Sequence, residues 1–249
     1  MRKLLTFVRK LLFPPRCAGC GACLAPTVGK EEPFCKDCKE ELERVFRAQC
    51  PDCFRDYPDC TCMPRAMKTA GVASFVKLVP YGDDAKYRVV RHMIHSLKSA
   101  PRPQLSRFLA QELSHGVKNA LLCCEAGVSE DVILHLPRDP RAIRRTGTDQ
   151  ARELACALSK ELGIPHKQVL RRVKRTKKQK SLGEKERMQN LARAFSLEED
   201  LKGKRVILVD DIVTTGAGMG VIARLLRAAG AVQVIAVSVA YTQKKKGRG

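Results

Sequence analysis

The sequence predicts an α/β fold in which a mostly parallel sheet is flanked by helices and is preceded by a small cysteine-rich module. Short apolar runs typical of buried strands alternate with helical patterns after Met63. One strand, one turn and one helix follow each other without interruption from Arg205 onward. Nine of the twelve cysteines lie between Cys17 and Cys62, apart from the α/β pattern. With 249 residues, of which 44% are hydrophobic, the chain can bury a full core.

The segment RVILVDDIVTTGAGMG, at residues 205–220, is the clearest βα unit. The apolar run at 206–209 suits a strand that is buried on both faces, as in a parallel sheet. Residues 221–229 have helical apolar spacing, and Gly230 stands where a helix C-cap belongs. A second apolar run at 232–240 completes a βαβ unit, which is the repeating element of parallel sheets.

The turn in this unit has the chemistry of a sugar-phosphate site. Small residues allow backbone N–H groups to approach a phosphate closely, and the following helix presents its positive end to the anion. Two adjacent carboxylates before the turn suit ribose hydroxyls or a hydrated Mg²⁺ ion, which usually binds through one or two carboxylates and several waters. The candidate ligand-binding residues are Asp210, Asp211, Thr214, Thr215, Gly216, Ala217 and Gly218.

Two other phosphate-binding motifs do not fit this turn. A Walker loop requires a lysine before its serine or threonine, and none lies between Asp210 and Gly220. A dinucleotide fingerprint requires a third glycine at the position of Val221, and its acidic residue follows the glycines rather than preceding them. The turn is therefore either a sugar-phosphate cradle or an ordinary strand-to-helix connection that uses glycine and threonine.

Two pairs of cysteines predict a structural zinc site near the N-terminus. Cys17 and Cys20 form one C-x-x-C pair, and Cys35 and Cys38 form a second pair. The separation between the pairs is that of a zinc ribbon. Four thiolates leave no open coordination position for water, so such a zinc ion would contribute to folding rather than to catalysis.

A second four-sulfur site would be formed by Cys50, Cys53, Cys60 and Cys62. The C-x-C pair in this set is less usual, and Cys23 is an alternative ligand. The other interpretation is a disulfide framework, which requires an oxidising compartment for which the sequence has no export signal. The remaining cysteines lie in apolar or helical contexts, where we expect them to be buried as small hydrophobic residues. These are Cys123, Cys124 and Cys156.

The first residues predict an amphipathic helix at 1–16 that ends at Pro14 and Pro15. We expect this helix to pack on its own protein, with binding to a membrane surface as the alternative. Arg9 and Lys10 interrupt the apolar core that a signal peptide needs, and no long apolar run occurs elsewhere. The sequence therefore predicts a cytoplasmic protein without a transmembrane segment.

Residues 131–137, DVILHLP, predict a further buried strand that leads into an arginine-rich loop. A cationic loop at the carboxyl end of such a strand is where open α/β sheets bind their ligands, and arginine is a natural partner of a diphosphate. The arginines of this loop are Arg138, Arg141, Arg144 and Arg145. The other expected elements are a strand at 72–81 and helices at 83–98, 103–118 and 149–162.

A net charge of +21 indicates an anionic partner such as nucleic acid, a phosphorylated metabolite or acidic lipid. Aromatic residues make up only 5% of the chain, so base stacking is not expected to be the main mode of any nucleic-acid contact. Ten basic residues lie at 167–187, in a run that is either a solvated face or part of a binding loop. The candidate anion-binding residues of this run are Lys174, Arg175, Lys177 and Lys178.

The sequence V-D-D-I-V-T-T-G resembles the phosphoribosyl-diphosphate (PRPP) loop of type I phosphoribosyltransferases. The resemblance implies a type I phosphoribosyltransferase-like fold in which Asp210 and Asp211 hold the ribose hydroxyls, residues 214–218 hold the 5-phosphate, and Mg²⁺ accompanies PRPP. In that family a mobile loop before this motif closes over the diphosphate. Gly218 replaces the usual threonine or serine, which removes one hydroxyl donor. Thr214 stands where purine-salvage relatives carry an aspartate for the base, so purine salvage is disfavoured.

The order of motifs along nearly the whole chain resembles the ComF/ComFC family, which is associated with natural competence and DNA uptake. After the cysteine-rich module come Y-G-D-D, D-V-I-L-H-L-P, R-T-G-T-D-Q-A, R-T-K-K-Q-x-x-L and V-D-D-I-V-T-T-G. The family usually shows G-F-N-Q where this chain has T-G-T-D-Q. The implied organisation is an N-terminal helix at 1–16, a zinc-ribbon module at 17–63, a phosphoribosyltransferase-like domain at 64–243 and a basic tail at 244–249.

Three functions are compatible with these features. The first is a ComF-like role in DNA uptake and natural transformation, with a PRPP-type site, a basic surface for single-stranded DNA and protein partners in the uptake machinery. The second is an active phosphoribosyltransferase, which would carry out glycosyl transfer from PRPP to a nitrogen acceptor. The third is a non-enzymatic module that binds PRPP or docks a partner. The sequence assigns no catalytic residue and no acceptor.

Overall fold

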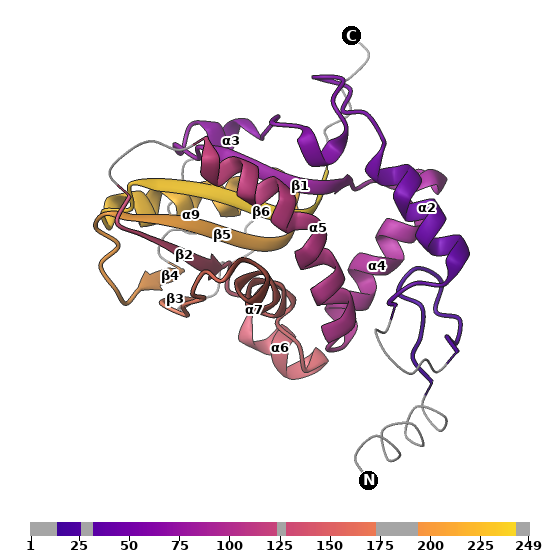
Figure 1. Cartoon of the computed structure of the whole chain (residues 1–249). Coiled ribbons are helices and arrows are strands. Elements are labelled where there is room, and N and C mark those ends of the chain that lie inside the picture. Colours follow the sequence, from indigo (N-terminus) through magenta and orange to yellow (C-terminus); the bar gives the residue numbers. More distant parts are fainter. Residues whose placement is uncertain (1–13, 26–31, 124–127, 173–193, 243–249) are drawn as a thin grey trace, which may run out of the picture.

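The computed structural model describes residues 14–25, 32–123, 128–172 and 194–242 (Figure 1). Several predicted features lie outside the described residues. These are most of the N-terminal helix, the basic tail at 244–249, Cys124, and the basic residues Lys174, Arg175, Lys177 and Lys178. Among the helices that the structure describes, none is both long and apolar enough to cross a membrane.

The main sheet has four parallel strands in the order β1-β6-β5-β2. The strands are β1 (Ser74–Pro80), β2 (Glu130–His135), β5 (Lys204–Val213) and β6 (Gln233–Tyr241). A separate antiparallel pair is formed by β3 (Leu170–Arg172) and β4 (Phe195–Leu197). Parallel order explains why the strand sequences are continuous apolar runs, because helices cover both faces of such a sheet.

Helices pack on both faces of the sheet (Figure 1). On one face lie α4 (Arg88–Ser99), α5 (Pro103–Leu122) and α7 (Gln150–Leu162). On the other face lie α3 (Arg65–Lys68) and α9 (Ala217–Ala228). Successive strand residues serve the two faces in turn: Ile207 packs in the first core and Leu208 in the second. The α/β prediction is therefore confirmed.

Most expected elements occur, with differences at their boundaries. The predicted strand at 206–209 is longer, since β5 runs through both aspartates to Val213. The helix expected at 83–98 begins as a 3-10 turn, η2 (Ala85–Tyr87), before α4 starts at Arg88. The arginine-rich loop contains a short helix, α6 (Pro140–Thr146), because Pro140 opens its first turn and the Asp139 side chain caps Arg141 N–H.

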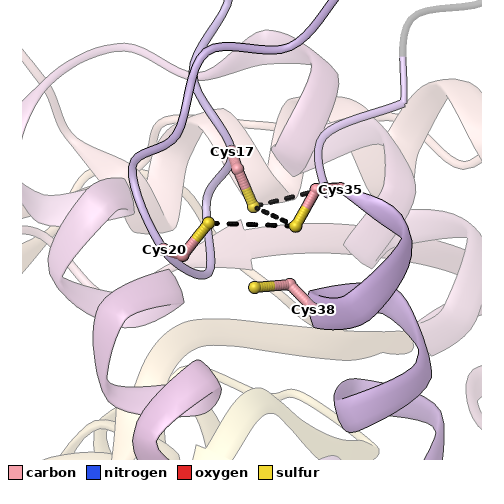
Figure 2. Close-up of side chains that lie close together, drawn as sticks. All are labelled: Cys17, Cys20, Cys35 and Cys38. Carbon is pink, nitrogen blue, oxygen red and sulfur yellow. Dashed lines mark hydrogen bonds between the residues drawn. The ribbon is translucent and has the colours of Figure 1, made fainter.

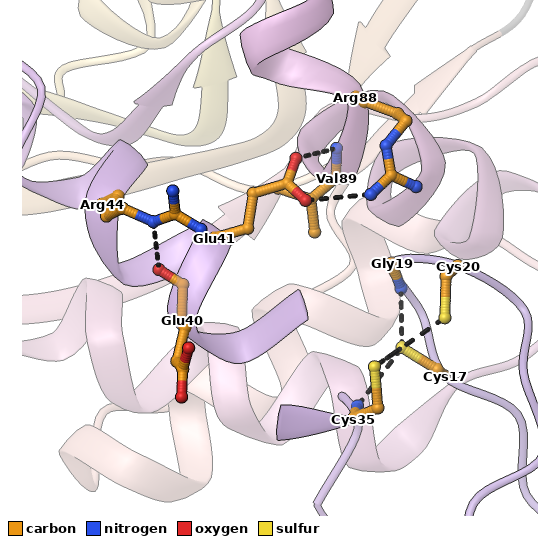
Figure 3. A network of polar contacts seen from close by, with 9 residues as sticks. All are labelled: Cys17, Gly19, Cys20, Cys35, Glu40, Glu41, Arg44, Arg88 and Val89. Carbon is orange, nitrogen blue, oxygen red and sulfur yellow. Dashed lines mark hydrogen bonds and ion pairs between the residues drawn. The ribbon is translucent and has the colours of Figure 1, made fainter. Parts of the chain in front are cut away.

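The cysteine-rich segment packs directly on the α/β core. Its helix α2 (Lys36–Phe46) buries Leu42 and Val45 in the same apolar cluster as Val89 of α4. The Glu41 carboxylate accepts hydrogen bonds from the Arg88 side chain at 2.9 Å and from Val89 N–H at 3.3 Å (Figure 3). The start of α4 is thereby tied to α2. Farther along, η1 (Tyr57–Asp59) lies against β1.

Candidate functional site

The turn between β5 and α9 is built from the residues that the sequence predicts to hold a phosphate. Gly216 adopts φ +71°, and a Cβ at this position would lie 2.7 Å from Pro64 Cβ, so both conformation and space require glycine. Thr214 and Thr215 are exposed. Ala217, the first residue of α9, donates its N–H to Thr215 Oγ1 at 3.4 Å. The turn thus leads into the first turn of a helix, where N–H groups lack intrahelical partners.

A cavity of about 160 Å³ opens beside this turn. Its wall is formed by Leu136, Asp210 and residues 212–219. The wall therefore combines one carboxylate, two threonine side chains and the backbone of the helix start. A phosphate group requires hydrogen-bond donors, and the hydroxyl groups of a sugar require acceptors. The wall of this cavity contains both donors and an acceptor.

Asp210 and Asp211 form a close acidic pair at the end of β5. Asp211 N–H donates to Asp210 Oδ1 at 2.9 Å. Burial, together with the neighbouring charge of Asp211, raises the pKa of Asp210 well above its usual range. The Asp211 side chain is buried, and its Oδ2 accepts no hydrogen bond from the part of the chain that the structure describes. The charge of Asp211 Oδ2 is therefore compensated by the ion pair with Lys98 rather than by a hydrogen bond.

Lys98, at the end of α4, connects this acidic pair to the arginine-rich loop. Its Nζ lies 3.1 Å from Asp211 Oδ2, at ion-pair distance but outside hydrogen-bond geometry. Its backbone carbonyl accepts a hydrogen bond from Arg138 at 3.4 Å. Lys98 is not among the site residues that the sequence predicts. Its sequence signals are its place at the end of the helix that follows Y-G-D-D, which belongs to the family-like motif order, and a helix-end position that is usually solvated.

The structure divides the predicted arginine set in two. Arg138 points inward, where it donates to Thr148 O at 2.8 Å and to Thr146 Oγ1 at 3.1 Å. These contacts hold the loop together, so Arg138 is engaged in the protein itself. The other three arginines lie on α6 and are exposed to solvent. They are Arg141, Arg144 and Arg145.

A row of buried and half-buried polar groups lies behind the arginine-rich loop. His135 Nδ1 lies 2.9 Å from His166 Nε2, and Cys156 Sγ lies 3.4 Å from His166 Nδ1. At the other end, His135 Nε2 is 3.9 Å from the carboxylate of Asp149, which caps α7. Burial, with electrostatic effects of the neighbouring His166 and Arg152, lowers the pKa of His135 to about 4. Both imidazoles are therefore neutral at pH 7. The row cannot be predicted from sequence spacing, because strands and loops far apart in the chain form it.

The first cysteine cluster has the dimensions of a tetrahedral zinc site. Figure 2 shows the sulfur atoms of Cys17, Cys20, Cys35 and Cys38 facing one another. The Sγ atom of Cys35 lies 3.7 Å from that of Cys17 and 3.8 Å from that of Cys20. Zinc–sulfur bonds of about 2.3 Å in a tetrahedron place the sulfurs about 3.8 Å apart. One pair stands in a turn and the other at the start of α2, rather than both in hairpins.

Backbone N–H donors stabilise the thiolate form of Cys17 in this cluster. Gly19 N–H and Cys35 N–H each donate to Cys17 Sγ at 3.3 Å (Figure 3). Burial raises the pKa of Cys17, but N–H donors from Cys35, Gly19 and Cys20 outweigh it and bring the pKa to about 7. A thiolate is the form that binds zinc, so the cluster is suited to the ion.

The second cysteine cluster is formed by Cys50, Cys53, Cys60 and Cys62. Its four sulfur atoms lie within 4.8 Å of one another, and Cys53 Sγ is 3.5 Å from Cys60 Sγ. These separations exceed a disulfide bond of about 2.05 Å and fit a common metal ion. Both clusters can bind zinc, whereas Cys23 is exposed and belongs to neither group.

The prediction for the remaining cysteines is partly wrong. Cys123 is exposed at the end of α5, because the helix runs beyond the predicted boundary at 118 and carries its last residues to the surface. Cys156 is half-buried and contacts His166.

Known proteins share sequence similarity with this chain. A phosphoribosyl transferase domain matches residues 148–248, the part of the chain that holds β5, the candidate phosphate-binding turn, α9 and β6. Over 222 residues the chain is 30% identical to Competence protein F of Haemophilus influenzae, and this match covers 88% of the chain and 86% of that protein. The chain belongs to the ComF family.

Other relatives match a smaller part of this ComF chain. DNA utilization protein YhgH of Escherichia coli K12 is 33% identical over 147 residues, which span 57% of the chain and 63% of that protein. A purine phosphoribosyltransferase of Pyrococcus horikoshii is 20% identical, with 54% of the chain and 80% of that structure covered and a TM-score of 0.32. The domain match and the parallel sheet together establish the phosphoribosyltransferase-like fold of the ComF chain.

Proposed function

We propose that this ComF-family protein acts in DNA uptake and binds PRPP or a related sugar phosphate at the β5–α9 turn. One observation carries the ligand proposal: Gly216, Asp210 and the start of α9 surround a single cavity of about 160 Å³. Helix N-termini and small-residue turns favour phosphate, and carboxylates favour sugar hydroxyls. In this proposal Asp210 and Asp211 receive the ribose hydroxyls, and residues 214–218 bind the 5-phosphate.

Magnesium would enter the same site together with the diphosphate. Burial, together with the charge of Asp211, raises the pKa of Asp210, and Lys98 offsets only part of this rise, so further positive charge would stabilise the pair. A hydrated Mg²⁺ ion would supply this charge through one carboxylate and several waters. The exposed arginines Arg141, Arg144 and Arg145 stand at the neighbouring strand end, where they suit a diphosphate or another polyanion. The basic residues Lys174, Arg175, Lys177 and Lys178 belong to the same proposal.

The proposed DNA partner is single-stranded DNA. The chain has a net charge of +21, and related proteins are named for competence and for DNA utilization. Helix α6 offers three exposed arginines on one short segment, and this surface has the charge that a phosphate backbone requires. The second cysteine segment is less suitable, because Asp52, Asp56 and Asp59 make it acidic. We further propose that residues 17–63 form a zinc module that braces the domain at 64–243 in the cytoplasm.

An active phosphoribosyltransferase is the second candidate. The acidic pair and the neighbouring arginines would position PRPP and neutralise the departing diphosphate, while a nitrogen nucleophile attacks the sugar. The third candidate, a PRPP-binding or partner-docking module without turnover, uses the same residues for binding alone. Diphosphate release in the presence of amines and nucleobases separates these two candidates.

The central experiment is a titration of PRPP and Mg²⁺ into wild type and into Asp210→Asn with Asp211→Asn. Loss of two charge-assisted hydrogen bonds predicts affinity about 100-fold weaker in the double variant. Asp200→Asn, on the exposed β4–β5 connection, is the control and should bind as wild type. Equal PRPP affinity of the double variant and wild type would show that PRPP does not bind at this turn.

A second titration tests the DNA partner. Arg141, Arg144 and Arg145 replaced together by glutamine should weaken binding of an oligonucleotide and lower the salt slope of log K by about 2. A salt slope equal to that of wild type would place the DNA on another surface.

A further inference from the structure

The second cysteine cluster is connected to the phosphate-binding turn by a very short path. Only Met63 and Pro64 separate Cys62 from α3, which is four residues long. A helix of this length has no stability of its own, so its position depends on the groups that hold its ends. One end continues toward β1, and the other end is attached to the cysteine cluster.

Helix α3 in turn packs against the turn and the start of α9. A Cβ on Gly216 would lie 2.7 Å from Pro64 Cβ and 2.9 Å from Met67 Cγ. A Cβ on Gly220 would lie 2.5 Å from the carbonyl oxygen of Ala66. Met67 is fully buried in the core that includes the helix α9. The two helices are therefore in contact so close that only glycine fits, and a shift of α3 would leave the turn without its support.

The segment that carries the second cluster packs on β1 and α5 through η1, but it has only a small apolar core of its own. Its own apolar cluster contains three buried residues, Cys50, Tyr57 and Cys60, and two of them are candidate metal ligands. So small a core does not fold by itself without a metal or a covalent link. By contrast, Cys17 and Cys38 of the first cluster lie within the large core that also contains α4 and α5.

Lys77 of β1 links the second cluster to the sheet and fits a metal-bound state. Its side chain is fully buried, and Nζ donates to Cys60 O at 2.7 Å and to Cys62 O at 2.8 Å. No carboxylate of the described residues forms an ion pair with it. Four thiolates around one Zn²⁺ ion carry a net negative charge, which would compensate a buried ammonium group.

We propose that zinc in the second cysteine cluster fixes α3 and, through α3, the shape of the phosphate-binding turn. The proposal rests on the proposed function only for the ligand that the turn receives. We call the connected unit of the second cysteine cluster, Lys77 and α3 the brace. The metal would lie at one end of this unit, and residues 214–220 contact its other end. Zinc occupancy of this cluster then controls whether the turn is ordered for a phosphate.

The test uses the full chain without added ligand, in which zinc content and amide hydrogen exchange are measured. Replacing Cys60 and Cys62 by serine should reduce zinc from two ions to one per chain. Exchange of peptides that cover 65–72 and 214–220 should become at least about tenfold faster, as expected for a locally opened segment. The matched control is Cys17→Ser with Cys20→Ser, which should also lose one zinc ion but leave exchange at 214–220 within about twofold of wild type.

A second pair of variants tests the contact without touching a ligand of the metal. Gly220→Ala forces α3 away from α9, so both zinc ions should remain while exchange at 65–72 and 214–220 rises. Gly218→Ala is its control on the same helix, because its Cβ would meet only Leu136 Cδ2 at an ordinary 3.7 Å.

Two results would overturn the proposal. One is wild-type exchange at 214–220 after the second cluster has lost its zinc. The other is an equal rise of exchange in the variants of both clusters, which would indicate general destabilisation. PRPP titration of the same samples distinguishes the two proposals. If exchange depends on the second cluster but wild type does not bind PRPP, the proposed ligand is rejected and the proposed role of zinc is retained.

Discussion

Two loops follow the carboxyl ends of neighbouring strands, and they are built in opposite ways. The β5–α9 turn is short, and its shape comes from the backbone, with Gly216 at φ +71° and α9 beginning immediately afterwards. The β2–α7 loop is long, contains α6, and is held by side chains: Arg138 donates to Thr146 and Thr148, and Thr148 donates to Glu153 at 2.7 Å.

If the β5–α9 turn binds the proposed sugar phosphate, this difference is the one between a binding site and a scaffold. In the first turn Thr214 and Thr215 are exposed and Asp210 lines the cavity, and the hydrogen bonds that Asp210 and Thr215 accept come from backbone N–H groups of neighbouring residues. In the second loop the most buried arginine is already occupied by the protein. Substitutions in the turn should therefore change binding more than folding, and substitutions behind the loop should change folding more than binding.

The largest effect is expected for Arg138→Leu. This change removes the hydrogen bonds that a charged donor makes to Thr148 O and Thr146 Oγ1, at a cost of about 3 kcal/mol in the free energy of unfolding. Urea denaturation measures the loss. Arg141→Leu, at an exposed position of α6, should stay within about 0.5 kcal/mol of wild type. Equal losses for the two variants would contradict the scaffold role of the loop.

The second prediction concerns the pH dependence of stability behind the same loop. The pKa of His135 is lowered by burial and by electrostatic effects of the neighbouring His166 and Arg152 to about 4 in the folded state, against an ordinary value of 6.5. As the pH falls from about 6.5 to 4, the unfolded chain takes up a proton that the folded chain refuses, so stability decreases by up to about 3 kcal/mol.

His135→Phe should remove this part of the pH dependence, since it deletes the titrating group. Unfolding free energies of wild type and variant, measured between pH 7 and 4, give the difference directly. His92→Gln, at an exposed position of α4, is the control and should keep the wild-type slope. A His135→Phe slope identical to that of wild type would show that the imidazole is not the group responsible.

The two loops also differ in how far the sequence predicts them. The β5–α9 turn is local: a buried strand, two acids, hydroxyl residues and glycines occur in one uninterrupted segment, so its residues and elements are predicted together. The cysteine clusters are predicted for the same reason, because ligand pairs at short spacing belong to one turn.

The β2–α7 loop depends on contacts between distant segments. The sequence identifies its arginines but not that Arg138 points inward, since this depends on the position of the Lys98 carbonyl at the end of α4. His135, His166 and Asp149 come from a strand, a loop and a helix cap, and no spacing rule connects them. Even in the predictable turn, the support of Gly216 by Pro64 is a packing relation that the sequence does not contain.

The third prediction concerns Lys98, which lies between the two loops. Lys98→Met removes the partner of a buried acidic pair, so without Mg²⁺ the free energy of unfolding should fall by about 1 kcal/mol. Mg²⁺ would then replace the missing charge and should raise the melting temperature of the variant more than that of wild type. Thermal denaturation with and without Mg²⁺ measures both effects. Lys98→Arg keeps the charge and serves as the control, and an equal Mg²⁺ response in all three proteins would contradict this role.

The smallest effect is expected for Gly218→Ser in the β5–α9 turn. A Cβ at this position meets only Leu136 Cδ2 at an ordinary 3.7 Å, so the Cβ of serine fits without displacing a neighbour. One further donor to the 5-phosphate is worth about 1 kcal/mol, which predicts PRPP affinity about fivefold tighter than that of wild type in a calorimetric titration. Gly216→Ala is the opposite control, because a Cβ there has a strained φ and clashes with Pro64, so binding should weaken. If Gly218→Ser binds no more tightly than wild type, the phosphate does not lie against the first turn of α9, and the turn would be a connection rather than a binding site.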